Sequence, residues 1–283
     1  MDNKGRVLAR AQAGPSNVVV VGKRQATMAL QKVLSAVGVP LDAVVAGMAG
    51  ADRPWVREFW HHLLYPNVAT DVWVVGDYRI AWAALTDGNP GMAAVFGTGS
   101  VIYAENGDHR IKVGGYGFKV GDVGSGIQLG QRAIQQVLAD LDGWGSKTRL
   151  TDSVLAWARV ANKDDLINYL YDPAVDWRTV SDLASEVFSL ADQDEGARAI
   201  LEQQASHITL QMRSAYTRAA LEKETASIGM TGGLSPFWLP YLQRACGYAE
   251  YPALQLIERS PVEGAARLAL AWSGDLSDND SEV

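Results

Sequence analysis

The sequence predicts an α/β fold, and three observations carry that prediction. Strand and helix signals alternate through residues 1–90, which is the pattern of parallel strands joined by crossover helices. Glycine-rich turns follow directly on predicted strands at residues 97–100, 114–117 and 229–233. A long helical region lies between the last two of these turns and completes the mixture of elements.

In the first half, each element rests on its apolar pattern and its end signals. One face of a predicted helix carries Ala26, Leu30 and Leu34, and Gly38 ends it. Pro54 is a typical first residue of a helix. The predicted elements are a strand at 6–13, a helix at 26–37, a strand at 43–48, a helix from 54, a strand at 72–75 and a helix at 78–85.

In the second half, short strands come one after another before the helices begin. Asn106-Gly107 between two strand-like runs predicts a tight hairpin. A helix with Ala197, Leu201 and Ile208 on one face is the clearest of the helical region. The predicted elements are strands at 92–96, 100–105 and 110–113, a helix at 197–215, a strand at 227–230 and a helix at 262–272.

Charge and composition exclude several classes of protein. The chain has 25 Lys and Arg residues and 32 Asp and Glu residues, and it contains no long basic run. This composition argues against a nucleic-acid or anionic-membrane binder. Cys246 is the single cysteine, so neither an internal disulfide nor a thiolate zinc site is expected. The first ten residues are polar, and no apolar run of about 18 residues occurs. We expect a cytoplasmic, globular protein.

Two carboxylates stand at junctions where α/β proteins place functional groups. Asp77 lies between a predicted strand and a predicted helix, where it is either a helix cap or a catalytic residue. Asp122 precedes another helix and has the same two interpretations. The glycine-rich turns are either ordinary loops or phosphate-binding turns. His61-His62 lacks the spacing of metal ligands, and we expect no metal site built from protein side chains alone.

A series of short motifs follows the same order as in a known family. They are residues 13–17 (Ala-Gly-Pro-Ser-Asn), 46–51, 76–81, 96–100 (Phe-Gly-Thr-Gly-Ser), 114–117, 121–126, 229–233 and 261–266. Together they resemble the N-acetylglucosamine and glucosamine kinase family, which has the BadF/BadG/BcrA/BcrD type of ATPase domain. That family lies in the sugar kinase–actin-like ATPase superfamily.

The resemblance implies two actin-like (ribonuclease H-like) lobes around an ATP cleft. On this basis residues 1–90 form a first lobe that is incomplete at its N-terminus. Residues 91–273 form a second lobe with a helical insertion, and residues 274–283 form a disordered acidic tail. It also implies ATP and Mg²⁺ as cofactors, a small amino sugar as substrate, and a family in which dimers are common.

The resemblance also assigns roles by position. Asp77 matches the catalytic base, which accepts the proton of the sugar hydroxyl. The residues that match sugar-binding positions are Asn17, Thr98, Gly114, Gly115 and Asp122. The residues that match nucleotide-binding positions are Gly97, Thr98, Gly99 and Ser100 in the second phosphate loop, and Gly232 and Gly233 in the adenosine turn.

The sequence departs from the family pattern in two places, and these leave an alternative function open. Val123 stands where the family usually has Glu. The family also begins with an Asp-Gly-Gly-Gly-Thr phosphate loop, whereas Met1 to Gly5 aligns after that loop. The alternative is therefore a catalytically impaired sugar-binding or regulatory homologue. A redox activator with a shared iron–sulfur cluster needs two thiolates per subunit, and Cys246 alone argues against it.

Overall fold

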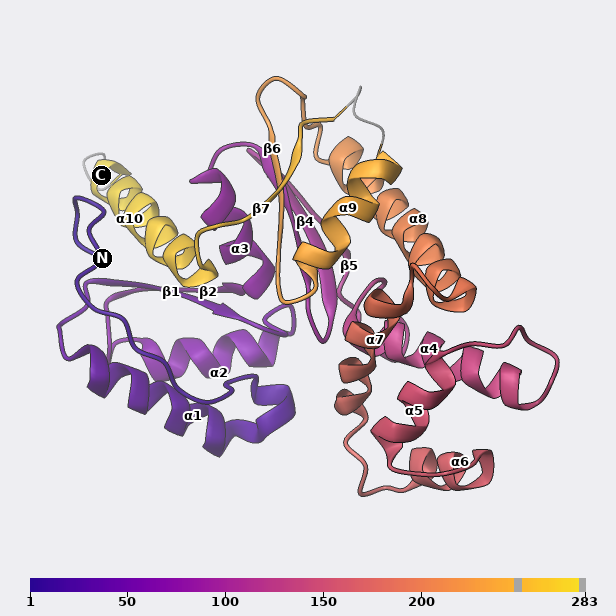
Figure 1. The fold of residues 1–283 in the computed structure, drawn as a ribbon. Helices are drawn as coiled ribbons and strands as arrows, with labels where there is room; N and C mark the ends of the chain where they lie inside the picture. Colours follow the sequence, from indigo (N-terminus) through magenta and orange to yellow (C-terminus); the bar gives the residue numbers. More distant parts are fainter. Residues whose placement is uncertain (247–250, 280–283) are drawn as a thin grey trace. The chain divides into compact units, whose positions relative to one another are not determined.

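A computed structural model describes residues 1–246 and 251–279 of the chain. It divides into two compact units (Figure 1). Each unit has its own cluster of buried apolar side chains. Unit 1 comprises Met1–Gly91 and Ile257–Val283, and unit 2 comprises Met92–Leu256. The predicted boundary near residue 90 therefore coincides with a boundary between compact units.

The sheet of unit 1 is a parallel pair of strands. β1 (Ala43–Met48) pairs with β2 (Asp71–Gly76) in a register that runs from Ala43–Asp71 to Met48–Gly76. The helix α2 (Pro54–Leu64) connects them, as parallel strands require a crossover. The alternation of strand and helix signals thus correctly predicted a parallel pair with a helical crossover.

Helices cover both faces of this strand pair (Figure 1). On one face, α2 and α1 (Val18–Val37) bury Ala26, Val56 and Trp60 against Met48 and Val74 of the strands. On the other face lie α3 (Asp77–Thr86) and α10 (Pro261–Asn279). Because successive strand residues face opposite sides, Gly47 meets α3 while its neighbour Met48 meets α1 and α2.

Two glycines let α3 lie close to both of its neighbours. A Cβ placed on Gly47 of β1 would overlap the side chain of Ile80 on α3. A Cβ placed on Gly264 of α10 would overlap the Ile80 carbonyl oxygen and lie 2.5 Å from the Ala84 nitrogen. Asp87, which caps the C-terminus of α3, is also paired with Arg259 and Arg267. The position of α3 is therefore set by backbone packing on two sides.

The last helix corrects two expectations from the sequence. Residues 257–273 are expected in the second lobe, but α10 packs on α3 and β1 and belongs to unit 1. Apolar residues such as Ala265, Leu268 and Ala269 are buried there, and sequence order alone could not show which core they join. Residues 274–279 are expected to be disordered, but they continue α10, since helix propagation is far less costly than nucleation. Residues 280–283 lie outside the described residues.

The predicted strand at residues 6–13 is absent. In the structure this segment pairs with no strand, and Asp2 instead accepts hydrogen bonds from the backbone N–H groups of Lys4 and Arg6. Val7 and Leu8 are exposed. A strand pattern specifies pairing only where one face is buried, and here neither is.

Unit 2 is built on a five-stranded sheet with the order β5-β4-β3-β6-β7. β4 (Ser100–Asn106) and β5 (His109–Gly114) form the predicted antiparallel hairpin. Its two turn residues are Gly107 and Asp108, because Asn106 already pairs with His109. The other strands are β3 (Gly91–Phe96), β6 (Ser227–Thr231) and β7 (Leu254–Leu256). Strands β6 and β7 are parallel.

The core of unit 2 lies between this sheet and its helices. Long helices bring Leu129, Ile208 and Trp238 into one apolar cluster with Phe96 and Ile102 of the sheet. The helical elements of unit 2 are α4 (Gly126–Leu141), α5 (Leu150–Ala158), α6 (Lys163–Tyr171), the 3-10 helix η1 (Trp177–Asp182), α7 (Leu183–Leu190), α8 (Glu195–Arg218) and α9 (Ser235–Cys246).

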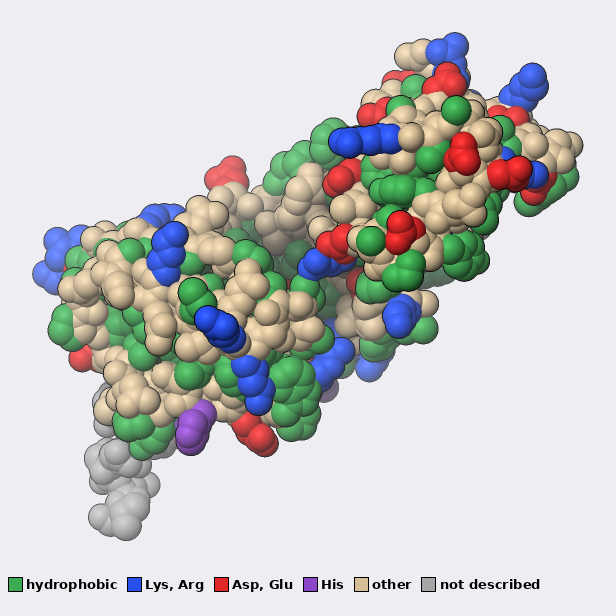
Figure 2. Space-filling model, turned by 90° about the horizontal axis from the view of Figure 1, so that it is seen from below, with side chains coloured by type: hydrophobic (Ala, Val, Ile, Leu, Met, Phe, Trp, Pro, Cys, Tyr) green, Lys and Arg blue, Asp and Glu red, His purple; other side chains and the backbone are tan. Residues whose placement is uncertain are grey.

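The distribution of charged side chains and the character of the helices bear on the classes of protein that the composition argued against. On the face drawn in Figure 2, Lys and Arg side chains are scattered among acidic and apolar ones and form no continuous basic patch. Among the described residues, no helix combines the length and apolar character that crossing a bilayer would need.

The contact between α10 and α3 leads to a stability prediction. Gly264→Ala should destabilise the protein by about 1–3 kcal/mol, because the new methyl group overlaps the backbone of α3 and the helices must move apart. Gly274 lies on the same helix, and a Cβ there meets no atom within 4 Å. Gly274→Ala is the matched control and should be neutral or stabilising by up to about 1 kcal/mol. Thermal melts test this pair; equal melting temperatures would contradict the proposed packing constraint.

Candidate active site

The predicted site residues fall in both units, and each set clusters within its own unit. Unit 1 contains Asn17 and Asp77, while unit 2 contains Asp122 and the glycine-rich turns. Asp77 and the glycine-rich turns lie at or directly after the C-terminal ends of strands, where α/β proteins bind ligands, whereas Asn17 precedes α1, the first element of the fold.

Asp77 is the first residue of α3, directly after β2 ends at Gly76. The N-cap position of the helix is Gly76, which has no side chain to cap it. The Asp77 carboxylate accepts the N–H of Tyr78 at 3.0 Å, and the residue is exposed. A carboxylate in the first turn also interacts favourably with the helix dipole. The structure thus places Asp77 at a strand end, and its bond to a first-turn N–H is compatible with the helix-cap interpretation as well as with the catalytic one.

Tyr78 and Asp52 form a pair beside Asp77 that the sequence analysis did not identify. The Tyr78 hydroxyl donates to Asp52, and the Tyr78 ring covers Gly76 so closely that no Cβ would fit there. Burial, followed by the bond to Asp52, raises the pKa of Tyr78, so it remains a neutral donor. The pair links the loop after β1 to the start of α3 and restrains the backbone that carries Asp77.

Asn17 caps α1, and this role was also not predicted. Its side-chain oxygen accepts the N–H of Val19 at 3.1 Å. That bond uses the amide oxygen, so the amide NH₂ group, with its two donors, is not part of the cap. Val19 lies beside Gly50, in the loop that follows β1. The cap therefore holds Asn17 at the same strand ends as Asp52 and Asp77.

In unit 2, Asp122 joins two of the glycine-rich turns. Its Oδ1 accepts the N–H of Gly117 at 3.0 Å, and its Oδ2 would lie 2.9 Å from a Cβ on Gly99. Asp122 is buried, and its backbone has a left-handed conformation with φ of 62°. Asp tolerates this conformation better than most residues. Burial raises its pKa, against the opposing effects of the Gly117 bond and of nearby Lys112. The bond to Gly117 and the close approach to Gly99 thus hold the Asp122 carboxylate at the predicted phosphate loop.

The predicted phosphate loop lies on the N-terminus of α4. The Gly97 carbonyl accepts the N–H of Gly126 at 2.8 Å, and the Thr98 carbonyl accepts that of Ile127 at 3.3 Å. Ser100 donates its hydroxyl to the Val123 carbonyl at 2.8 Å. A Cβ placed on Gly97 would meet no atom within 4 Å, so one side of the loop is open to a ligand.

Gly114 and Gly115 lie next to this loop because of the hairpin register. Gly114 pairs with Val101, directly after Ser100, and both glycines have positive φ. The Gly115 carbonyl accepts a hydrogen bond from Lys112 Nζ at 3.3 Å. Val123, which replaces the Glu of the family pattern, packs against the hydrophobic core.

The two glycines of the predicted adenosine turn have different surroundings. A Cβ on Gly232, whose φ is +103°, would overlap the carbonyl oxygen of Phe96 at the end of β3. The same carbonyl accepts the N–H of Leu234 at 3.1 Å. A Cβ placed on Gly233 would meet no atom within 4 Å, so this residue is the open position of the turn. Gly232 brings the turn against the phosphate loop, and Gly233 faces free space.

Gln204 and Trp238 support this region, and neither was predicted. Both side chains bond to Gly124, which lies between Asp122 and the start of α4. The Gly124 N–H donates to Gln204 Oε1 at 3.1 Å, and Trp238 Nε1 donates to the Gly124 carbonyl at 2.9 Å. Both side chains are buried. A polar Gln204 beside the apolar face of the helix around Leu201 was the one signal in the sequence that could have indicated such a role.

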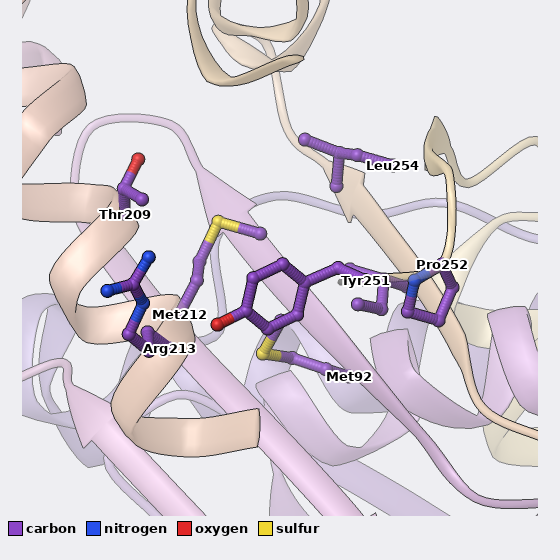
Figure 3. Close-up of a pocket in the computed structure, with 8 residues that line it drawn as sticks. Met92, Thr209, Met212, Arg213, Tyr251, Pro252 and Leu254 are labelled. Carbon is purple, nitrogen blue, oxygen red and sulfur yellow. The ribbon is translucent and has the colours of Figure 1, made fainter. Parts of the chain in front are cut away.

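The apolar pocket shown in Figure 3 lies away from the glycine-rich turns. It is lined by Met92, Met212 and Tyr251, among others, and has room for about one water molecule, at about 20 Å³. Met92 is near the start of β3 and Gly97 follows its end, so roughly 16 Å of extended strand separates them. The pocket is not part of the candidate active site.

Comparison with known proteins identifies the fold and the family. The structure resembles that of a Chromobacterium violaceum protein assigned provisionally as an N-acetylglucosamine kinase, with a TM-score of 0.72 and 23% identity over 91% of this chain and 88% of the other. This likeness establishes the fold, which is that of the actin-like sugar kinases. The predicted fold class is therefore confirmed.

The family follows from the sequence match. The BadF/BadG/BcrA/BcrD ATPase family model matches residues 1–237, and the chain belongs to this family. An N-acetylmuramic acid/N-acetylglucosamine kinase of Clostridium acetobutylicum is 28% identical, over 81% of this chain and 78% of that protein. An N-acetyl-D-glucosamine kinase of Dictyostelium discoideum is 27% identical, over 95% of this chain and 92% of that protein.

The different surroundings of Gly232 and Gly233 lead to a prediction for nucleotide binding. Gly233→Val should weaken ATP binding by about tenfold or more while leaving the melting temperature close to that of the wild type, because its side chain fills open space. Gly232→Ala should instead lower the melting temperature, because its methyl group overlaps Phe96. Calorimetric titration and thermal melts of both variants test this. A Gly233→Val protein with wild-type ATP affinity would remove this turn from the nucleotide site.

Proposed function

We propose that this chain is an ATP-dependent kinase that transfers a phosphoryl group to a hydroxyl of an amino sugar, with N-acetylglucosamine and glucosamine as the substrates to test. The observation that carries the proposal is Asp77, an exposed carboxylate at the start of α3, directly after β2 ends. The kinase names of the two curated relatives support it and do not favour the impaired, non-catalytic alternative.

In this mechanism Asp77 is the general base. Phosphoryl transfer depends mainly on positioning and charge neutralisation, together with a group that takes the proton of the attacking hydroxyl. The Asp77 carboxylate accepts that proton, and the Tyr78–Asp52 pair positions the backbone beside it. The amide NH₂ of Asn17 and the carboxylate of Asp122 bind sugar hydroxyls.

The residues of unit 2 fit a nucleotide. Gly97 and Gly233 are open on one side, so phosphate groups and a ribose can approach the backbone there without meeting a side chain. Thr98, Gly99 and Ser100 complete the phosphate loop. Bound ATP supplies the phosphoryl group, and the protein's part is to hold it and exclude competing geometries.

Mg²⁺ would enter this site together with ATP. In kinases this ion is bound by one or two carboxylates, by phosphate oxygens and by waters, and not by a cage of protein ligands. The described residues include no cluster of three or more His, Cys, Asp or Glu that could hold a metal ion. Mg²⁺ would therefore be held mainly by the phosphate oxygens of ATP and by waters, next to the phosphate loop.

The role of Asp77 is tested by an isosteric substitution. Asp77→Asn should lower kcat about 10²–10⁴-fold, because the amide cannot accept the proton, while thermal stability changes little. Asp164 is the matched control, since it is also an exposed carboxylate in the first turn of a helix. Asp164→Asn should keep full activity. Wild-type turnover by a folded Asp77→Asn protein, measured as sugar-dependent ADP release, would refute the assignment.

A further inference from the structure

A polar groove lies between α8 and α9, on residues that the proposed reaction does not use. Its volume is about 350 Å³, within the range of small-molecule sites. The side chains that give it chemical character are Glu202, Ser206 and Arg213 of α8, and Tyr241 and Arg244 of α9. Arg213, seen in Figure 3, also lines the narrow pocket at Tyr251.

The groove presents two guanidinium groups without a carboxylate partner. Among the described residues, neither Arg213 nor Arg244 forms an ion pair, although the chain as a whole carries a net charge of −7. The guanidinium carbon of Arg244 lies 4.9 Å from the centre of the Tyr241 ring. This contact restrains the cation without consuming its N–H donors, because the ring accepts through its face. Guanidinium groups of this kind suit phosphate, which they can bind through paired N–H donors.

The remaining groups suit the polar body of a small phosphate ester. Glu202 can accept hydrogen bonds from hydroxyl or ammonium groups, and the Ser206 hydroxyl can donate or accept. Burial raises the pKa of Tyr241, so its phenol stays neutral and offers an apolar ring face. Along α8, Glu202 and Ser206 precede Arg213 by about two to three helical turns, so a phosphate bound to Arg213 with hydroxyl groups nearer Glu202 describes a sugar phosphate.

Both walls of the groove also hold the loop that carries Asp122. From α8, Gln204 accepts the N–H of Gly124, and from α9, Trp238 donates to the carbonyl of the same residue. Gly124 follows Asp122 by two positions. A molecule that contacts α8 and α9 together would favour one spacing of the two helices, and Gly124 connects both helices to the loop that carries Asp122.

We propose that the groove between α8 and α9 is a second ligand site, for a phosphorylated sugar, and that its occupancy alters the affinity of the chain for its sugar substrate. The site is distinct from the glycine-rich turns. Binding to it is measurable whether or not the chain turns over.

The binding experiment is calorimetric titration of the full chain, with sugar and a non-hydrolysable ATP analogue present in excess. The probes are glucosamine 6-phosphate, glucose 6-phosphate and inorganic phosphate. Both sugar phosphates should bind, and more tightly than inorganic phosphate. A stronger preference for the amino form would assign the ammonium group to Glu202. No added heat with either sugar phosphate, or equal affinity for inorganic phosphate, would overturn the proposal.

Arginine variants locate the binding event. Arg213→Gln and Arg244→Gln should each raise the dissociation constant of the sugar phosphate about tenfold or more, because each removes charge-assisted hydrogen bonds to phosphate. Arg218→Gln is the control, since Arg218 ends the same helix and does not line the groove. Wild-type affinity in both groove variants, or an equal loss in the control, would place binding elsewhere.

The coupling through Gly124 has its own test. Gln204→Met keeps the size of the side chain, and the N–H of Gly124 retains Gln128 as an acceptor at 3.1 Å. In the wild type, the sugar phosphate should shift the dissociation constant of the amino sugar. In Gln204→Met the sugar phosphate should still bind, with a smaller shift. An identical shift in the two proteins would exclude Gly124 as the connection.

Discussion

Side chains from two helices hydrogen-bond to the backbone of Gly124, and the arrangement of unit 2 depends on these two bonds. Gln204 of α8 and Trp238 of α9 hold its N–H and its carbonyl, and a Cβ on Gly124 would lie 2.5 Å from Ile208. The loop held this way contains Asp122 and leads into α4, whose first N–H groups bond to the carbonyls of Gly97 and Thr98. Buried backbone groups are costly when unpaired, so the loop and the helices hold one another in place.

In unit 1, close backbone packing holds the helix that carries Asp77 in place. Helix α3 begins with Asp77 and lies between Gly47 and Gly264, neither of which leaves room for a side chain. The Tyr78–Asp52 pair then restrains the start of the helix. In both units, a carboxylate at a strand end is positioned by glycine contacts and buried hydrogen bonds that lie beside it. A precise position for such groups is what phosphoryl transfer requires.

The sequence predicted the elements with strong periodicity and clear end signals, such as the helix after Pro54 and the hairpin at Asn106-Gly107. It also placed Asp77 at a strand end. It could not predict long-range partners: Asp52 for Tyr78, or Gln204 and Trp238 for Gly124, because these pairs meet only in the folded chain. For the same reason it assigned α10 to the wrong unit, and it could not distinguish Gly232, packed on Phe96, from the open Gly233.

The central claim is that this chain transfers phosphate from ATP to an amino sugar, and ³¹P NMR tests it most directly. The purified chain would be incubated with ATP and Mg²⁺, with and without N-acetylglucosamine or glucosamine. The account predicts a new sugar-phosphate resonance that grows together with ADP, and only when a sugar is present. ADP formed at the same rate without sugar, or a sugar that stays unphosphorylated while the chain binds both substrates, would contradict it.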